Sequence, residues 1–392
     1  MTDKHQFDGR MVRISNVFDL QMGKTPSRKN PLYWRDGNHD WISIADLSSF
    51  GKYVGKTKEQ INDFAVKESG IKPIPTNTVL MSFKLSLGKT SITTEPVYTN
   101  EAIMAFINKG LYSVDTSFMY HQCRSKNWAV GTNDAVMGKT LNKRTLGQSV
   151  IFLPSFEEQR SIAAKLDFID EQLQKTKNVL QKLDSLVKSR FVEMFEDKGY
   201  PVSYLSHLTS SMRNGMSPSK SGSHHSKVLT LSAVTQGRFN SAAWKDGFFA
   251  EKPPIDKHVS VDDFYVCRGS GNIHLVGSGE YPDRPMEDVV FPDTMIAAKI
   301  KQGQIILPYL RYAWAQSSTR RQIEASAKTT NGTFKINQTM LGNIKIPVPP
   351  LKIQQEFADF AASVDKSRFV AQQQIEKLQM LYDSLAQEYF GE

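Results

Sequence analysis

Apolar residues recur at alternating steps of four and three over two long stretches of the chain, which predicts two long amphipathic helices. The first stretch runs from Pro154 to Asp197. Its beginning is marked by Ser155 and Glu158, which are spaced as a helix capping box. Steps of this kind are the a/d seam of a coiled coil. The predicted seam consists of Ile162, Leu166, Ile169, Leu173, Thr176, Leu180, Leu183 and Val187.

The same pattern returns 195 residues later, without a gap. Pro154 becomes Pro349 and Gln159 becomes Gln354. A shared start, a shared register and a fixed spacing indicate an internal repeat rather than two unrelated helices. The second predicted seam consists of Phe357, Ala361, Val364, Arg368, Ala371, Ile375, Leu378, Tyr382, Leu385 and Tyr389.

The two helices divide the chain into four parts: a block at 1–150, a helix at 151–198, a block at 199–347 and a helix at 348–392. The blocks also resemble one another. The run GKTPSR from Gly23 aligns with GMSPSK from Gly215 at an offset of 192, and the same offset brings Thr99 onto Phe291. Identity between these anchors is weak, so we expect a common scaffold that carries two different surfaces.

Each block combines predicted strands with a predicted helix, which favours an α+β fold. In the first block we expect strands at 40–45, 78–83 and 102–107 and a helix at 114–124. In the second we expect strands at 227–231, 264–268 and 295–300 and a helix at 308–325.

The order of the parts favours an antiparallel pairing of the two helices. A helix of about 42 residues is roughly 60 Å long at ~1.5 Å per residue. The second block joins the end of the first helix to the beginning of the second, so a parallel pair would force it to bridge that length. We therefore expect an antiparallel coiled coil with a pseudo-two-fold axis and one globular block at each end.

Composition and charge add a class of partner. The chain has 392 residues, of which 40% are hydrophobic and 23% charged, a normal globular composition. A net charge of +9 favours a polyanionic partner. Two cysteines, Cys123 and Cys267, are too few for a disulfide framework. A polar N-terminus and the lack of a long apolar run predict a cytoplasmic protein without a membrane partner.

Two similar basic blocks on one spacer suit a reader of two separated sites on double-stranded DNA. Lysine and arginine would contact phosphates and read guanine, and asparagine and glutamine would read adenine. In the first block the candidates are Lys24, Arg28, Lys29, Tyr33, Trp34, Lys84, Lys89, Lys139 and Lys143. In the second block they are Arg213, Lys220, Lys227, Arg268, Asn272, Lys328 and Lys335.

The chain resembles the specificity subunits of type I restriction–modification enzymes. The resemblance rests on the order block–helix–block–helix, on the run G-x-T-P-S-R-x-x-x-x-Y-W from Gly23 to Trp34, and on the junctions LP…EQ at Leu153 and VPP…QQ at Val348. It implies that each block is a target recognition domain for one half of a split DNA sequence. It also implies that the helices dock two methyltransferase subunits and that restriction subunits join them. S-adenosylmethionine, ATP and Mg²⁺ would then bind to the partner subunits. The second block lacks the Tyr-Trp pair of the motif.

Two other functions stay open at this point. The segment Asn30-Pro31-Leu32-Tyr33 is similar to the Asn-Pro-Pro-Tyr motif of DNA amino-methyltransferases, but it lacks the second proline. A coiled-coil adaptor without a nucleic-acid role is the other alternative. His224-His225 and the pair Cys267 and His274 do not form a four-ligand metal set, so we expect neither a metal site nor a catalytic site.

Overall fold

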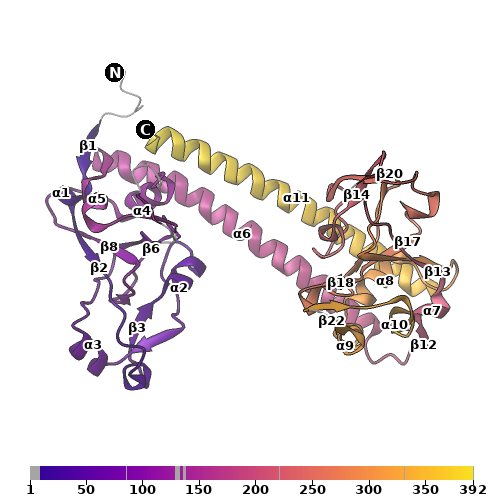
Figure 1. Cartoon of the computed structure of the whole chain (residues 1–392). Helices are drawn as coiled ribbons and strands as arrows, with labels where there is room; N and C mark the ends of the chain where they lie inside the picture. Colours follow the sequence, from indigo (N-terminus) through magenta and orange to yellow (C-terminus); the bar gives the residue numbers. More distant parts are fainter. Residues whose placement is uncertain are drawn as a thin grey trace. The chain divides into compact units, whose positions relative to one another are not determined.

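The computed structural model describes residues 9–84, 86–128, 133–135, 138–219, 221–330 and 332–391. It divides into two compact units (Figure 1). Unit 1 comprises Met1–Val179 and Ala371–Glu392, and unit 2 comprises Leu180–Val370. Each of the two longest helices contributes one segment to each unit. In the described part of the chain, none of the helices is long and apolar enough to cross a bilayer.

Unit 1 is built on a four-stranded antiparallel sheet and a smaller three-stranded sheet. The larger sheet has the order β2 (Phe18–Met22), β8 (Ile103–Asn108), β5 (Val79–Ser82), β6 (Thr90–Ile92). The smaller has the order β4 (Glu59–Ile61), β3 (His39–Ile42), β7 (Tyr98–Thr99), with β3 and β7 parallel. Two further pairs are β1 (Gly9–Arg13) with β11 (Val150–Pro154) and β9 (Asn133–Ala135) with β10 (Gly138–Thr140). The short helices are α1 (Ile14–Val17), η1 (Pro31–Trp34), α2 (Ile44–Ser49), α3 (Asp63–Ser69), α4 (Thr116–Ser125) and α5 (Lys143–Gln148).

Unit 2 has two four-stranded sheets. The first has the order β13 (Thr209–Asn214), β21 (Met295–Ile300), β17 (Asp263–Cys267), β19 (Gly279–Glu280). The second has the order β15 (Trp244–Phe249), β14 (His224–Leu229), β20 (Met286–Val290), β16 (His258–Val259). The smaller sheets are β12 (Val202–Tyr204) with β24 (Lys345–Pro347), and β18 (Gly269–Ser270), β23 (Thr333–Lys335), β22 (Lys328–Thr330). The short helices are α7 (Leu205–Leu208), η2 (Leu231–Ala233), η3 (Ile255–Lys257), η4 (Ile273–Leu275), α8 (Leu307–Trp314), α9 (Ser317–Ser326) and α10 (Gln338–Gly342).

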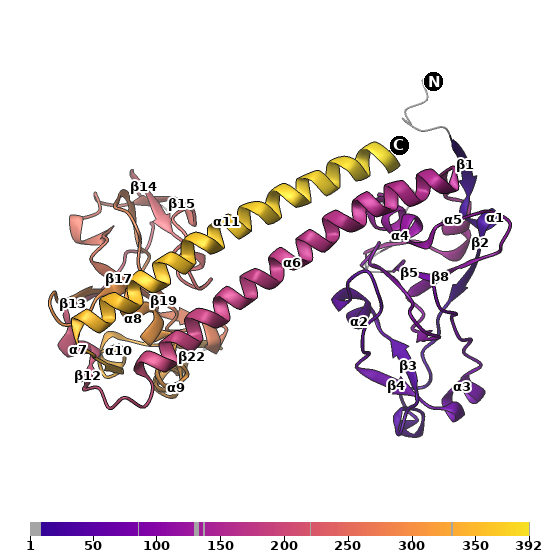
Figure 2. The same ribbon diagram turned by 180° about the vertical axis from the view of Figure 1, so that it is seen from behind.

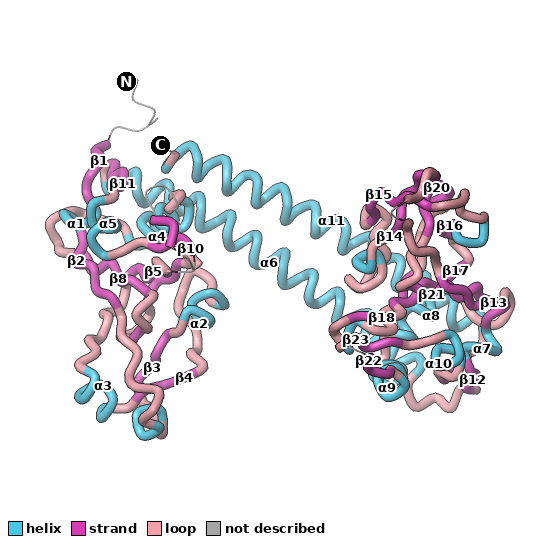
Figure 3. The backbone as a smooth tube through the Cα atoms, in the orientation of Figure 1, coloured by secondary structure: helices cyan, strands magenta, loops and turns pink. Residues whose placement is uncertain are grey.

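The two units repeat one topology (Figure 3). The order β2-β8-β5-β6 in unit 1 matches β13-β21-β17-β19 in unit 2. The parallel pair of β3 and β7 matches that of β14 and β20. The pair of β1 and β11 matches that of β12 and β24. The expected α+β fold with two similar blocks and two long helices is therefore confirmed.

The two long helices are α6 (Phe156–Phe195) and α11 (Leu351–Phe390), and their bounds differ by the 195 residues of the repeat (Figure 2). The predicted cap of α6 is present, because the Ser155 backbone N–H donates to the Glu158 carboxylate at 3.0 Å. The Glu158 N–H in turn donates to the Ser155 hydroxyl at 3.2 Å.

Each unit contains a paired segment of the two helices. In unit 1 the seam residues of α6 are buried in one core with the C-terminal part of α11: Ile162, Leu166, Ile169, Leu173, Tyr382, Ala386, Tyr389 and Phe390. In unit 2 the core includes Val187, Phe191, Phe195, Phe357, Ala361 and Val364. The segments of unit 2 run in opposite directions, because Asp184 pairs with Arg368 while Arg190 pairs with Glu356. The remaining predicted seam leucines and isoleucine are half-buried: Leu180, Leu183, Ile375, Leu378 and Leu385.

Three of the predicted elements are wrong in detail. The strand expected at 40–45 ends at Ile42, because Ser43 and Asp46 form a capping box that starts α2. The strand expected at 227–231 gives way to the 3-10 turn η2. The helix expected at 308–325 is two helices, α8 and α9. It breaks at Gln316, whose backbone is extended (φ −66°, ψ 149°), and the side chains of Gln316 and Thr319 donate to the carbonyls of Tyr312 and Ala313 at 3.0 and 2.9 Å.

Two buried glutamines join the long helices to the blocks in the same way. The Gln159 amide nitrogen donates to the carbonyls of Ser113 and Pro154, and its oxygen accepts from the N–H of Asp115, the N-cap of α4. In unit 2, Gln354 donates to the carbonyls of Gln304 and Pro349, and its oxygen accepts from the N–H of Ile306, the N-cap of α8. Both glutamines are at most 1% exposed.

Candidate nucleic-acid interface

The loop that follows β2 begins at a glycine that has no room for a side chain. A Cβ at Gly23 would lie 2.2 Å from the carbonyl oxygen of Thr99. A Cβ at Gly215, the equivalent in unit 2, would lie 2.1 Å from the carbonyl oxygen of Phe291. Both distances are too short for a real contact, so only glycine fits there. The offset of 192 that aligns Gly23 with Gly215 also aligns Thr99 with Phe291. The same close approach of a carbonyl therefore requires a glycine at both positions.

Arg28 is held by a carboxylate and by two tryptophans. Its Nη2 donates to the Glu59 carboxylate at 2.8 Å. The guanidinium lies 3.8 Å from the centroid of the Trp34 ring, and Trp34 packs edge-on against Trp41 at 5.0 Å. The hydrogen bond between Arg28 and Glu59 raises the pKa of Arg28 and lowers the pKa of Glu59. Arg28 therefore stabilises the loop, and its bidentate donors already have an acceptor.

Other residues of the sequence motif have a similar role. The Lys24 ammonium donates to the Ser69 carbonyl, and the Thr25 hydroxyl donates to Glu101. The Tyr33 ring lies 5.4 Å from that of Phe64. The amide of Asn62 donates to the carbonyls of Leu32 and Arg35 at 2.8 and 3.0 Å. The motif from Gly23 to Trp34 thus forms one loop that several side-chain contacts tie to the rest of unit 1.

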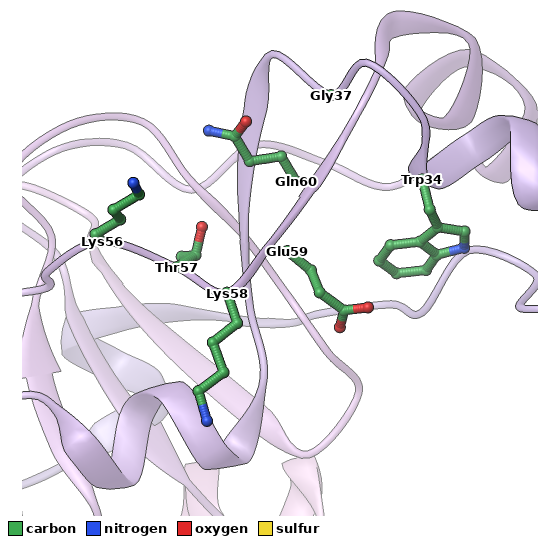
Figure 4. A pocket seen from close by; sticks show the side chains of 7 residues that line it. All are labelled: Trp34, Gly37, Lys56, Thr57, Lys58, Glu59 and Gln60. Carbon is green, nitrogen blue, oxygen red and sulfur yellow. The ribbon is translucent and has the colours of Figure 1, made fainter.

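A cleft of about 320 Å³ lies beside this loop (Figure 4). It is lined by Trp34, Gly37, Lys56, Thr57, Lys58, Glu59 and Gln60. Lys56 and Lys58 are exposed on either side of the buried Thr57, whose hydroxyl donates to Asp40 at 2.6 Å. In Figure 4 the Lys58 side chain points away from Trp34, while Glu59 is directed towards it.

Lys56 and Lys58 were missed by the sequence reasoning, although two lysines flanking one threonine just before β4 are a visible signal. In the described part of the chain, neither lysine forms an ion pair with a carboxylate, and the same holds for the exposed Lys29. These three ammonium groups are available to an external anion.

The other predicted DNA contacts of unit 1 lie at separate places. Lys84 is half-buried, with its ammonium 5.2 Å from the Phe83 ring. Lys89 is exposed between β5 and β6, and Lys143 is exposed at the start of α5. Lys139 lies in β10, where Asp134 is its partner in backbone register. Their role as DNA contacts stays a prediction.

Several predicted contacts of unit 2 have partners within the unit. Arg213 forms a bidentate pair with the fully buried Asp263 and donates to the Asp256 carbonyl at 2.6 Å. The Arg268 guanidinium donates to a carbonyl oxygen, that of Asp293, at 3.1 Å. Two more candidates also have a partner in unit 2. The Lys227 ammonium lies 4.6 Å from the Trp244 ring, and the Asn272 side chain caps η4.

Three predicted residues remain in unit 2. Lys328 and Lys335 are exposed and lie opposite one another on β22 and β23. Lys220 lies outside the described residues.

Two other candidate sites were the methyltransferase-like segment at Asn30 and a metal site, and neither is formed in the described residues. The Asn30 side chain accepts from the Leu32 N–H at 3.2 Å and caps η1, so it has a local structural role. Within the described ranges, no group of three or more His, Cys, Asp or Glu residues could hold a metal ion.

Comparison with known proteins gives consistent matches. The family model for the type I restriction modification DNA specificity domain matches residues 8–184 and 283–380. The chain is 28% identical over 194 residues to the type I restriction enzyme MjaIX specificity subunit of Methanocaldococcus jannaschii, which covers 48% of this chain and 44% of that protein. It is 30% identical over 114 residues to the EcoprrI specificity subunit of Escherichia coli, covering 29% and 28%. The matched regions thus span less than half the length of these two curated relatives.

The fold matches two solved structures over almost their whole lengths. The crystal structure of a type I restriction–modification S subunit from M. genitalium matches with a TM-score of 0.61 and 15% identity, and the match covers 100% of both chains. A chain from a structure on complex assembly and conformational transition of a type I R-M system matches with a TM-score of 0.60 and 16% identity over 99% of both chains. At these identities the likeness is one of fold.

Proposed function

Because the chain belongs to the family of type I restriction modification DNA specificity domains, we propose that it is a DNA-binding subunit that reads a bipartite target, with one half-site for each unit. The observation that carries this proposal is the duplicated topology with different residues at equivalent places. Unit 1 has Lys-Thr and a Tyr-Trp pair in its first loop, whereas unit 2 has Met-Ser and no such pair. Two copies of one scaffold with different surfaces suit two different half-sites.

Exposed cations without internal partners support DNA as the ligand. Among the described residues they include Lys29, Lys56 and Lys58 in unit 1 and Lys328 and Lys335 in unit 2. Lysine ammonium groups act as point charges and suit phosphate oxygens. The internally paired Arg28 and Arg213 instead hold the loops on which such contacts depend.

The chemistry of the complex would then belong to partner subunits. The relatives are named specificity subunits of type I restriction enzymes, which supports a non-catalytic role for this chain. Methyltransferase subunits, two in number, and restriction subunits would supply the sites for S-adenosylmethionine, ATP and Mg²⁺. The long helices offer exposed apolar residues for docking such partners: Phe168, Phe369 and Met380, each more than 60% exposed. Exposed charges on α6 include Arg160, Lys175 and Lys182.

DNA binding by the chain assembled with its methyltransferase subunits tests the proposal. Since phosphate contacts release counterions, log K should fall linearly with log salt between ~50 and ~200 mM. Mapping of methylated sites in cells that express the complex should give a target of two specific parts separated by an unread spacer. Binding that is insensitive to salt, or a single undivided target, would contradict the proposed function.

A further inference from the structure

The hairpin of β22 and β23 in unit 2 carries two lysines in direct opposition. Lys328 of β22 and Lys335 of β23 are partners in the antiparallel register, and both are exposed. Residues directly opposite one another on two strands have Cβ atoms about 5 Å apart, and like charges in such a pair are destabilising. Within the described ranges, no carboxylate forms an ion pair with either lysine. The pair therefore lacks a counter-charge inside the unit.

The surrounding structure keeps this pair accessible and fixed in place. On the other side of β23, the residue in register with Lys335 is Gly269 of β18, which has no side chain to cover it. Phe334, the neighbour of Lys335 in β23, packs against the core of unit 2. The Ile336 N–H donates to the Arg268 carbonyl at 2.9 Å and ties the end of β23 to the loop before β18.

The fold itself does not require two lysines here. The 195-residue repeat carries β22 onto β9 and β23 onto β10. Lys328 then corresponds to Asn133 and Lys335 to Thr140, which are partners in the register of the unit 1 hairpin. The equivalent pair is therefore neutral in unit 1. Since the scaffold tolerates a neutral pair, the charge in unit 2 is better explained by an external anion.

We propose that Lys328 and Lys335 together bind one phosphate of the DNA backbone and thereby anchor the unit 2 hairpin on its half-site. This inference rests on the proposed function. Because their Cβ atoms are about 5 Å apart, the two lysine side chains can bring both ammonium groups to oxygens of the same phosphate, which offsets their mutual repulsion. They lack the planar fork with which arginine reads guanine, so the contact positions the unit without reading sequence.

The test replaces both lysines by glutamine, K328Q with K335Q, in the chain assembled with its methyltransferase subunits. Glutamine keeps much of the side-chain length and removes the charge. The slope of log K against log salt should become shallower by about one, because one phosphate contact is lost. Affinity should fall by the same factor for a duplex with the mapped target and for one with a scrambled target. The methylated sequence should not change.

The matched control is K198Q, since Lys198 is an exposed lysine of the same unit in the loop after α6. Its slope should equal that of the unchanged complex. An unchanged slope in the double variant would overturn the inference and leave the proposed function standing, whereas a flat wild-type plot would overturn the proposed function. A slope shallower by about two would show that the lysines hold separate phosphates. A changed methylated base would assign them to base reading, and loss of the methyltransferase subunits on purification would assign them to a protein contact. Each of these three results would overturn the inference that the two lysines bind one phosphate together.

Discussion

His121 is completely buried in unit 1, where it links α4 to both long helices. Its Nε2 lies 2.8 Å from the Asp167 carboxylate of α6, and its Nδ1 lies 2.8 Å from the Tyr382 hydroxyl of α11. A neutral ring with its proton on Nε2 satisfies both contacts, since it donates to Asp167 and accepts from Tyr382. Burial lowers the pKa of His121. Burial also acts to raise the pKa of Asp167, but hydrogen bonds from His121, Lys52 and Ser117 outweigh it and lower that pKa to about 2.

These two shifts predict that unit 1 becomes less stable in acid. A histidine whose folded pKa lies below the unfolded value of about 6.5 takes up a proton more readily after unfolding. Stability should therefore fall as the pH drops below about 6.5, and the contribution of Asp167 should be lost further down, from pH ~4 towards ~2. His121→Gln should flatten the dependence between pH ~6.5 and ~5. Urea denaturation midpoints measured across this range would show it.

The matched control for this experiment is His207→Gln, at an exposed position in α7 of unit 2. That variant should keep the pH dependence of the unchanged chain. If His121→Gln retained the whole dependence between pH ~6.5 and ~5, the buried histidine would not be its source.

At the scale of single residues, the sequence identifies the basic side chains but not their partners. Arg28 was a candidate DNA contact because of its charge, yet Glu59, which holds it, lies 31 positions away. Arg213 pairs with Asp263 across 50 positions. Partners so far apart become visible only when the sheets are assembled. Lys328 and Lys335 were also candidates because of their charge, and they are exposed, but their role as DNA contacts stays a prediction.

At the scale of elements, the buried glutamines at the start of the long helices give a second prediction. Gln159→Leu keeps the size of the side chain but leaves the N–H of Asp115 and the carbonyls of Ser113 and Pro154 without this partner. Losing such buried partners costs about 1–3 kcal/mol. The free energy of unfolding of the isolated chain should fall by that amount, and Gln354→Leu should have a similar effect because its three contacts are equivalent.

Gln174→Leu is the matched control for the glutamine variants. Gln174 is exposed on α6 and donates to Asn178, one turn further on. A surface change of this kind should alter stability by no more than about 0.5 kcal/mol. A loss at Gln174 as large as that at Gln159 would mean that helix propensity, and not the buried contacts, causes the effect.

The elements that the sequence predicted best are those with the longest periodic patterns. The repeated seam predicts helices at 151–198 and 348–392, and the structure has α6 at Phe156–Phe195 and α11 at Leu351–Phe390. Short elements are less certain because one side chain can end them. Ser43 converts the end of an apolar run into the start of α2, and Gln316 separates α8 from α9.

At the scale of the whole molecule, the apolar cores fall within single units. The largest core of unit 1 joins its large sheet to α4 and to the seam residues that unit 1 takes from α6 and α11. The largest core of unit 2 is built in the same way from the corresponding elements. Each unit therefore carries the contacts that its own block needs, which makes exchange of blocks a direct test of the division.

The last prediction concerns such an exchange. Residues 1–154 should be replaced by the corresponding part of a relative, because β1 pairs with β11 and this boundary keeps both strands together while leaving the cap of α6 intact. The methylated sequence should then change in one half-site only, since the second core is untouched. The reciprocal exchange of residues 199–349, which keeps β12 with β24, should change the other half-site and leave the first as it was. Methylation mapping of the two chimeras decides the matter. If both half-sites changed together in a chimera that still methylates DNA, the two units would not read DNA independently.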